Sequence, residues 1–195
     1  SISSRESGGI ELKFLPQSIP DIFLIEPTLH GDHRGYFAET FRQESLEKAI
    51  GYRVEFVQDN ESKSTKGVLR GLHYQLPPHD QSKLVRVIEG SVIDVVVDIR
   101  KASPTFGEYV SAVLTSDNKH QLFVPRGFAH GFVVLSDEAV FSYKVDNYYA
   151  PQYERGIAFD DNDLGINWQM PLSELQLSDK DKNHPSLANA RELFE

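Results

Sequence analysis

Hydrophobic and polar positions alternate along short segments that turn residues separate, and this pattern predicts a chain built mainly of β-strands. The clearest segment is 92–99, in which one set of alternate positions is Ile or Val throughout and the other set includes Asp94 and Asp98. Its two faces are therefore expected to meet different environments. Further strands are predicted at 21–26, 36–41, 54–58, 68–75, 84–88, 108–114, 121–124, 129–135 and 139–146.

Helix signals are few along this chain. A helix is predicted over 43–50, which Gly51 can close as a C-cap, and a second short helix over 187–194. Strands at this spacing predict an all-β sandwich or barrel with one or two short helices. No linker rich in Gly, Pro or Ser divides the chain, so we expect an N-terminal tail over 1–18 and a single domain over 19–195.

Composition and charge exclude several functional classes. The 195 residues include 20 Lys and Arg against 29 Asp and Glu, a formal net charge of −9. An acidic surface argues against binding nucleic acid or an anionic membrane, and no apolar run approaches the roughly 20 residues of a membrane span. There is no cysteine, which excludes disulfides, thiolate zinc sites and a cysteine nucleophile and fits a reducing compartment such as the cytoplasm.

A turn followed by a histidine is the first chemical signal. Residues 125–130 have the order Pro-x-Gly-x-x-His, which resembles the second motif of cupins, small β-barrels of the jelly-roll type. The first cupin motif would begin near Gly71, and it normally supplies a His-x-His pair and a Glu to a metal. Here a tyrosine and a glutamine follow His73, so the ligand set is incomplete. We therefore expect a jelly-roll (cupin-type) barrel without a metal.

A closer resemblance rests on several ordered blocks. They are GDHRGYF at 31–37, FVQDN at 56–60, GVLRGLHYQ at 67–75, KLVR at 83–86, VPRGFAHGF at 124–132, FSYK at 141–144, NYYAP at 147–151 and LSDKD at 177–181. Together they closely resemble the dTDP-4-dehydrorhamnose 3,5-epimerase family over about 19–185. The resemblance implies a dTDP-linked 4-keto-6-deoxy sugar as substrate, inversion at C3 and C5 in dTDP-rhamnose biosynthesis, no metal or organic cofactor, and a cytoplasmic homodimer.

The resemblance also implies catalytic roles. His73 matches the family's base, and an imidazole with a pKa near ~6.5 is suited to accept a proton near neutral pH. Asp181 matches the aspartate that orients this base, although Asp179 is an alternative from sequence alone. Tyr143 matches the acid, whereas its periodicity alone would make it a core residue. Lys83 matches the cation near the C4 oxygen, where a localised charge stabilises an enolate.

The remaining matches concern substrate binding. Asp94 and His130 resemble a second carboxylate–imidazole pair, in which the histidine touches the substrate and the aspartate supports it; by alternation alone Asp94 could equally face solvent. Arginine suits phosphate because its fork matches phosphate oxygens. The other matched contacts are Arg70 for the diphosphate, Arg34, Phe37 and Glu39 for the nucleotide, Gln58 and Asn60 for polar contacts, and Tyr149, Glu154 and Lys180 at the rim.

One spacing conflicts with a regular strand. Arg70 and His73 are three residues apart, so on a regular strand they would face opposite sides although both are expected at one pocket. A bulge at Gly71 would restore a common face; alternatively, Arg70 reaches over the mouth of the barrel. If the family's dimer carries over, some of Arg34, Phe37 and Glu39 complete the pocket of a second subunit.

Three alternative functions stay open. An epimerase for C3 or C5 alone, or a ketoisomerase, acting on a related nucleotide-linked 4-keto sugar could use the same residues, because one base and one acid can serve one carbon or two. A non-catalytic sugar-nucleotide-binding cupin would keep Arg70 and need neither acid nor base. A metal-dependent cupin enzyme is opposed by the missing His-x-His pair.

Overall fold

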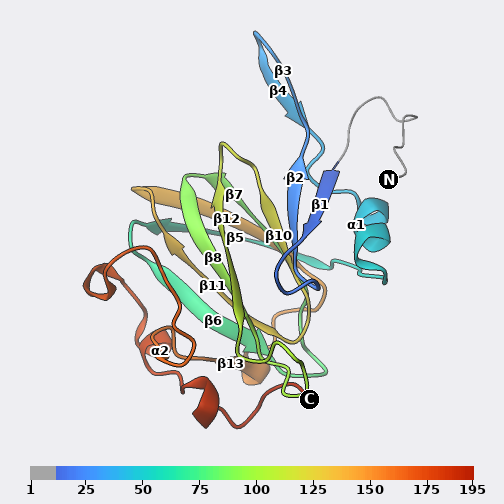
Figure 1. Ribbon diagram of the computed structural model, residues 1–195. Helices are drawn as coiled ribbons and strands as arrows, with labels where there is room; N and C mark the ends of the chain where they lie inside the picture. Colours follow the sequence, from blue (N-terminus) through green and yellow to red (C-terminus); the bar gives the residue numbers. More distant parts are fainter. Residues whose placement is uncertain (1–11) are drawn as a thin grey trace.

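The computed structural model describes residues 12–195 and consists mainly of two antiparallel sheets that face each other (Figure 1). The six-stranded sheet has the order β1 (Leu12–Pro16), β2 (Phe23–Pro27), β10 (Gln121–Val124), β7 (Lys83–Glu89), β12 (Glu138–Val145) and β5 (Gln58–Thr65). The five-stranded sheet has the order β13 (Glu154–Gly156), β6 (Leu69–Gln75), β11 (Phe128–Val134), β8 (Ser91–Asp98) and β9 (Tyr109–Thr115).

The predicted all-β, cupin-type fold is confirmed, but the sheets do not close into a barrel. No ladder joins the two sheets within 12–195: the polar β5 and the three-residue β13 are edge strands that do not pair with each other. The helices are α1 (Gln43–Ile50), α2 (Asp179–Lys182) and the short 3-10 helices η1 (Pro151–Tyr153), η2 (Leu172–Glu174) and η3 (Leu187–Asn189). None of the helices in the described part is long and apolar enough to cross a membrane.

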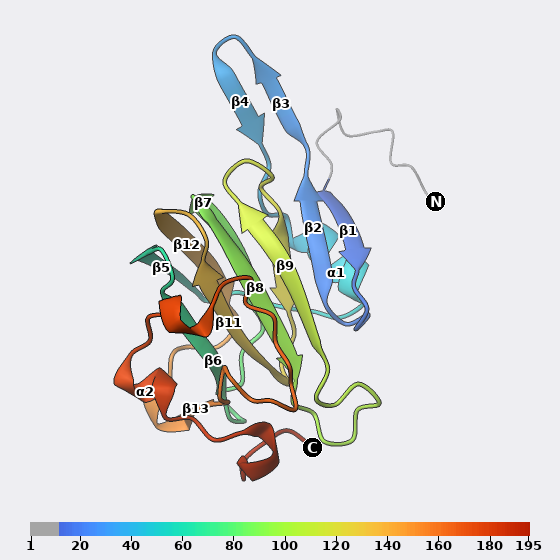
Figure 2. The same cartoon turned by 60° about the vertical axis from the view of Figure 1, so that its left-hand side comes forward.

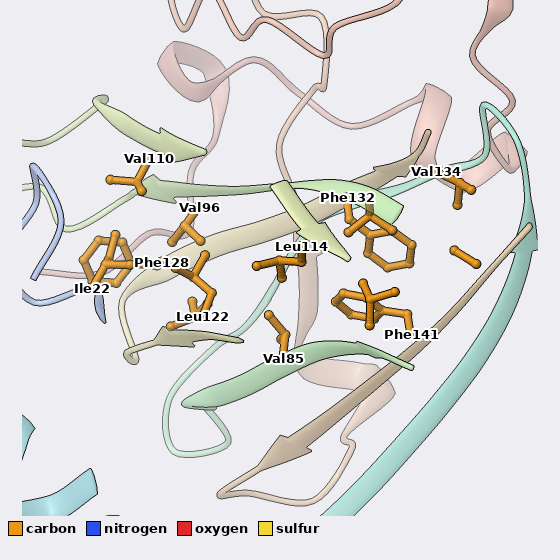
Figure 3. Close-up of a cluster of buried hydrophobic side chains, with 14 of the residues drawn as sticks. Ile22, Val85, Val96, Val110, Leu114, Leu122, Phe128, Phe132, Val134 and Phe141 are labelled. Carbon is orange, nitrogen blue, oxygen red and sulfur yellow. The ribbon is translucent and has the colours of Figure 1, made fainter. Parts of the chain in front are cut away.

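The main core fills the space between the two sheets. Val85 from one sheet and Val96, Leu114 and Phe132 from the other are buried there, and Phe132 stacks on Phe141 with ring centroids 4.1 Å apart (Figure 3). This packing explains the alternation in β8. Its even-numbered valines face this core, whereas its odd-numbered residues face a second apolar cluster on the other side of the sheet.

The second cluster is covered by the C-terminal segment. The segment after β13 runs over the outer face of the five-stranded sheet (Figure 2). Its Ile157, Leu164 and Trp168 are buried in the second cluster, and Trp168 Nε1 donates a hydrogen bond to the Phe159 carbonyl at 2.9 Å. The helix expected over 187–194 is limited to η3, because Ser186 accepts a hydrogen bond from Asn189 N at its start and the chain leaves the helix at Ala190. This segment carries α2 to the sheet.

A third apolar cluster lies on the outer face of the six-stranded sheet. The helix predicted over 43–50 is confirmed as α1; it ends at Gly51, and its Leu46 is buried against Phe123. Leu12 and Phe14 of β1 pack on the same cluster and β1 pairs with β2. The described part of the predicted tail therefore includes a strand, whereas its first eleven residues lie outside the described part.

Two strands have bounds that differ from those predicted from the sequence. The strand expected over 54–58 is β5, which starts at Gln58 and runs to Thr65 through a segment with no apolar alternation. The strand expected over 36–41 is β4 (Gly35–Ala38), which pairs with β3 (Leu29–Asp32) in a hairpin that projects away from both sheets (Figures 1 and 2). Neither segment packs a regular apolar face into the main core, so apolar periodicity could not locate it.

Of the two alternatives left open for Arg70 and His73, the structure shows the β-bulge at Gly71. Two residues of β6, Gly71 and Leu72, oppose the single Gly131 of β11, so the register shifts between the pairs that contain His73 and Arg70. A Cβ at Gly71 would lie 2.6 Å from Gly131 Cα, which shows how closely the two backbones approach. The extra residue turns the side chains of Arg70 and His73 to the same side.

Gly71→Ala is expected to destabilise the protein more than Gly35→Ala. Their φ angles are nearly equal, +138° and +135°, and each substitution carries a backbone strain of roughly 1–3 kcal/mol. Only the Cβ at position 71 meets other atoms, since nothing lies within 4 Å of one at Gly35. Urea unfolding of both variants measures the difference, and equal losses would contradict the close approach of β6 and β11.

Candidate active site

A pocket of about 310 Å³ opens between the two sheets. Most of the predicted site residues line it: Asn60, Arg70, His73, Lys83, His130, Tyr143, Glu154, Lys180 and Asp181. A larger hollow of about 710 Å³, lined by Tyr52 and Arg126 among others, contains none of the predicted site residues. The chemistry indicated by the sequence therefore belongs to the smaller pocket.

His73 on β6 contacts Asp181 on α2, with Nε2 and Oδ1 2.5 Å apart. Asp181 is buried, and its Oδ2 accepts a hydrogen bond from Gly71 N at 3.3 Å. Asp179 lies exposed at the start of α2, so the structure selects Asp181 as the partner of His73. Because an ionised carboxylate only accepts hydrogen bonds, His73 Nε2 carries the proton and Nδ1 is left with the free lone pair.

The charge state of Asp181 follows from its neighbours. Burial acts to raise its pKa, but the hydrogen bonds from His184 and His73, with the charge of His73 and the Gly71 N–H, hold that pKa well below its usual range. Asp181 is therefore an anion throughout the neutral pH range. An anion at this position orients His73 and stabilises the imidazolium that forms when the ring accepts a proton.

A second carboxylate–imidazole pair lies beside the first. His130 on β11 is the cross-strand neighbour of His73, and its Nε2 lies 2.7 Å from Asp94 Oδ1 on β8. Asp94 is fully buried, so the alternative of a solvent-facing residue is wrong. Burial raises the pKa of Asp94, while the charges of His130 and Lys83 and the hydrogen bond from His130 act in the other direction.

Lys83 and Tyr143 enter the pocket from the opposite, six-stranded sheet. They lie on β7 and β12, and Lys83 Nζ is 5.9 Å from the Tyr143 ring centroid. Burial lowers the pKa of Lys83 to about 8, against the opposing charges of Glu154 and Asp94. Burial raises the pKa of Tyr143, against a hydrogen bond with Asn60 that lowers it. At neutral pH the lysine is charged and the phenol keeps its proton.

Polar side chains surround the open side of the pocket. Arg70 Nε donates to Ser64 Oγ at 3.0 Å, and Lys180 forms an ion pair with Glu154. Gln58 and Tyr149 do not line the pocket but adjoin it: Gln58 Nε2 donates to Asn60 Oδ1 at 2.8 Å, and Tyr149 hydrogen-bonds Glu154. The open side thus presents both charged and neutral donors.

Three predicted nucleotide contacts lie away from this pocket. Arg34 and Phe37 are on the β3–β4 hairpin, where Arg34 pairs with Asp32 and Phe37 is 61% exposed. Glu39 follows the hairpin and forms an ion pair with Arg42. Because the hairpin projects away from both sheets (Figure 2), a single chain does not bring these residues to its own pocket.

Several residues at the site were not predicted. Glu61, Ser62, Phe132, Phe141 and Ser178 line the pocket, and Ser62 shares the strand parity of Asn60, a signal that the sequence did contain. His184 lies behind Asp181 with Nε2 3.0 Å from Oδ1. Its spacing of three from Asp181 places the two side chains on neighbouring positions at the end of α2.

The same cluster is the group of side chains in 12–195 that could hold a metal ion. The ligand atoms of His73, Asp181 and His184 lie within 4.8 Å of one another. Asp181 Oδ1 contacts both imidazoles at hydrogen-bond distances, so the arrangement as it stands is a hydrogen-bonded cluster.

The fold and the pocket define a class of protein. It is a cupin-type double-sheet protein in which a carboxylate-paired histidine on one sheet faces a lysine and a tyrosine on the other, a set of groups suited to moving protons at carbon. A sequence model of the dTDP-4-dehydrorhamnose 3,5-epimerase family matches residues 16–189. The chain therefore belongs to the dTDP-4-dehydrorhamnose 3,5-epimerase family.

Individual proteins support this assignment. The dTDP-4-dehydrorhamnose 3,5-epimerase of Shigella flexneri is 54% identical over 92% of this chain and 98% of its own. The crystal structure of dTDP-4-dehydrorhamnose 3,5-epimerase from Elizabethkingia anophelis NUHP1 has a TM-score of 0.89 at 49% identity, covering 91% of this chain and 97% of the other. The dTDP-6-deoxy-D-glucose-3,5-epimerase of Legionella pneumophila Philadelphia 1, solved with dTDP-4-keto-L-rhamnose, has a TM-score of 0.89 at 45% identity, covering 93% and 95%.

The partly buried Lys83 predicts a pH-dependent difference in stability. Its pKa is about 8 in the folded state, whereas an exposed lysine has a pKa of 10.5. Between these pH values the unfolded chain binds more protons, so the free energy of unfolding rises with pH. Lys83→Met lacks this rise and is expected to be more stable than the wild type at pH 7. Melting temperatures from pH 7 to about 10.5 measure the difference, with the exposed Lys66→Met as control; a difference that stays constant with pH would contradict it.

Proposed function

We propose that this protein converts dTDP-4-dehydro-6-deoxyglucose to dTDP-4-dehydrorhamnose by inverting C3 and C5. The observation that carries the proposal is that His73 and Tyr143 enter one pocket from opposite sheets. Epimerisation removes a proton from one face of a carbon and returns a proton to the other, so it needs a base and an acid on opposite sides. Family membership supports the choice of substrate.

In the proposed first step His73 acts as the base. The C4 ketone makes the C3 and C5 protons acidic, because the electron pair of the broken C–H bond is delocalised into an enolate. His73 accepts the proton on its free ring nitrogen and becomes an imidazolium. The Asp181 carboxylate, 2.5 Å from the other ring nitrogen, stabilises that charge.

Lys83 is proposed to stabilise the enolate and Tyr143 to supply the proton that ends the step. An ammonium in a partly dehydrated pocket interacts strongly with the negative charge that develops on the C4 oxygen. Tyr143 then donates its phenolic proton to the opposite face of the carbon, and the enolate electron pair forms the new C–H bond. Before the next turnover the His73 imidazolium releases its proton to water and the Tyr143 phenolate takes one up, so the cycle needs no metal or organic cofactor.

The polar rim is proposed to hold the rest of the substrate. Arg70 and Lys180 are the cations at the open side of the pocket and would face the diphosphate. His130, oriented by Asp94, and the amide pair Gln58 and Asn60 would contact the sugar. As the family resemblance implies, the proposal places the enzyme in the cytoplasm.

Proton exchange tests the reaction. With the 4-keto sugar nucleotide in D2O, the wild type should remove the C3 and C5 proton signals from the NMR spectrum. His73→Ala should abolish exchange at both carbons. Tyr143→Phe should keep exchange on the base side but lower net inversion by roughly 10²–10⁴-fold, the range of a general acid.

The same spectra separate the alternatives. Exchange at one carbon only would assign the protein to single epimerases, and a ketone that moves to C3 would identify a ketoisomerase. Binding of the nucleotide sugar without exchange would identify a binding module and would remove the roles given to His73 and Tyr143.

We also propose a homodimer in which the β3–β4 hairpin of one subunit completes the pocket of the other. Tyr36 and Phe37 are 63% and 61% exposed, although large apolar side chains are usually buried when they have a partner surface. Arg34, Phe37 and Glu39 are predicted nucleotide contacts, and none of the three lines the pocket that contains His73. Two equal subunits that exchange hairpins would form two complete sites.

Mixing two defective variants tests the shared site. Phe37→Ala and His73→Ala should each be inactive or nearly so. After co-refolding at equal amounts, half of the dimers are mixed and one of the two sites in each is intact, so about a quarter of the wild-type rate should return. Light scattering reports the oligomeric state; a mixture that stays inactive, or an active monomer, would refute the exchange of hairpins.

A further inference from the structure

We propose that His184 is a positioning residue for the catalytic base, because it holds the Asp181 carboxylate in the orientation that fixes His73. The proposal rests on the function given above and extends it to a residue outside the pocket lining. His184 follows α2 and donates from Nε2 to the same carboxylate oxygen that contacts His73, Oδ1, at 3.0 Å.

Three donors hold the Asp181 carboxylate. Oδ1 accepts from His73 at 2.5 Å and from His184 at 3.0 Å, and Oδ2 accepts from Gly71 N at 3.3 Å. A carboxylate with donors on both oxygens cannot rotate about its Cβ–Cγ bond without breaking one of them. Of these hydrogen bonds, the one from His184 makes the largest contribution to lowering the pKa of Asp181, ahead of His73 and Gly71.

The His184 ring packs on the backbone of β13 at Gly156. A Cβ at Gly156 would lie 2.3–2.5 Å from three atoms of the ring, so the imidazole lies directly on the backbone of β13. Gly156 is the cross-strand partner of His73, so the contact between Gly156 and His184 lies beside the proposed base. A backbone hydrogen bond fixes the chain next to His184: Ala158 N donates to the Pro185 carbonyl at 2.8 Å.

His184 also limits the position of the His73 ring directly. The two rings meet edge to face with centroids 5.7 Å apart, and the His184 side chain is only 10% exposed. His73 therefore has the Asp181 carboxylate at one ring nitrogen and the His184 ring beside it. Without His184, Asp181 loses one hydrogen-bond donor and the His73 ring loses one of the groups that pack against it.

Three single variants separate hydrogen bonding from packing. His184→Phe keeps an aromatic ring and removes the donor. His184→Gln places an amide N–H at about the same reach from the backbone. His120→Phe is the matched control, since His120 lies on the approach to β10 and its nearest charged partner is Glu26 at 3.7 Å.

Steady-state kinetics give the first readout. His184→Phe should lower kcat roughly ten- to hundredfold with little change in KM, because misplacing a catalytic group by about 1 Å costs up to about 10²-fold. His184→Gln should recover most of the lost rate, and His120→Phe should keep the wild-type rate. Equal losses in His184→Phe and His184→Gln would reduce His184 to a packing residue and overturn the proposal.

A double-mutant cycle tests the packing contact between Gly156 and His184. Gly156→Ala should lower kcat although it keeps His184, because the methyl group displaces the ring. Once His184→Ala has removed the ring, adding Gly156→Ala should have little further effect, and this non-additivity is the mark of two residues acting through one contact. Additive losses would show that Gly156 acts independently of His184.

A readout without substrate keeps the test independent of the proposed reaction. Histidine side-chain 15N spectra of the wild type should show His73 as a single Nε2–H tautomer, and His184→Phe should distribute it over both tautomers. An unchanged His73 tautomer would overturn the positioning role. If the spectrum changes but the wild type does not turn over the sugar nucleotide, the positioning role stands and the proposed function fails.

Discussion

The backbones of β6 and β11 approach so closely at Gly71 and Gly131 that neither position has room for a Cβ. This contact inserts the extra residue into β6 and turns Arg70 and His73 toward the same pocket. A regular β6 would send one of the two into the apolar cluster beneath the C-terminal segment, where a charged group would have no water and no partner. The pocket therefore depends on two glycines that allow the backbones of β6 and β11 to come into direct contact.

Six charged or ionisable side chains of this pocket region form pairs across different elements, whereas Lys83 does not. The pairs are His73 with Asp181, His130 with Asp94, and Lys180 with Glu154. Lys83 forms no ion pair with any residue between 12 and 195 that would offset its burial, and it is the cation whose pKa is lowered to about 8. A partly dehydrated cation that forms no ion pair binds a developing anion more strongly than a neutralised one would, even though Glu154 and Asp94 act on it from a distance. The stability lost at Lys83 is therefore tied to the position where the proposed enolate oxygen lies.

The features that the sequence predicted are those with local causes. Alternation in 92–99 and the cap at Gly51 are local signals, and both elements formed where expected. β5 begins later in the chain than predicted, because its side chains line a pocket and give no apolar alternation. The family blocks placed most pocket residues, including Asp181, but a pattern along the chain could not locate His184, whose position depends on the absence of a side chain at Gly156. The location of Arg34 and Phe37 depends likewise on how the hairpin leaves the sheets.

His73 and Asp181 are 108 residues apart in the chain, and this separation has a consequence for biosynthesis. The ribosome makes β6 early and the C-terminal segment late, so both sheets can pair before the carboxylate is available. A nascent chain at that stage would hold a folded pocket with an unoriented imidazole. Completion of the C-terminal segment over the five-stranded sheet thus supplies the carboxylate as a late event, and a chain cut short before Asp181 would lack both the partner of His73 and the part of the apolar cover that includes Leu187.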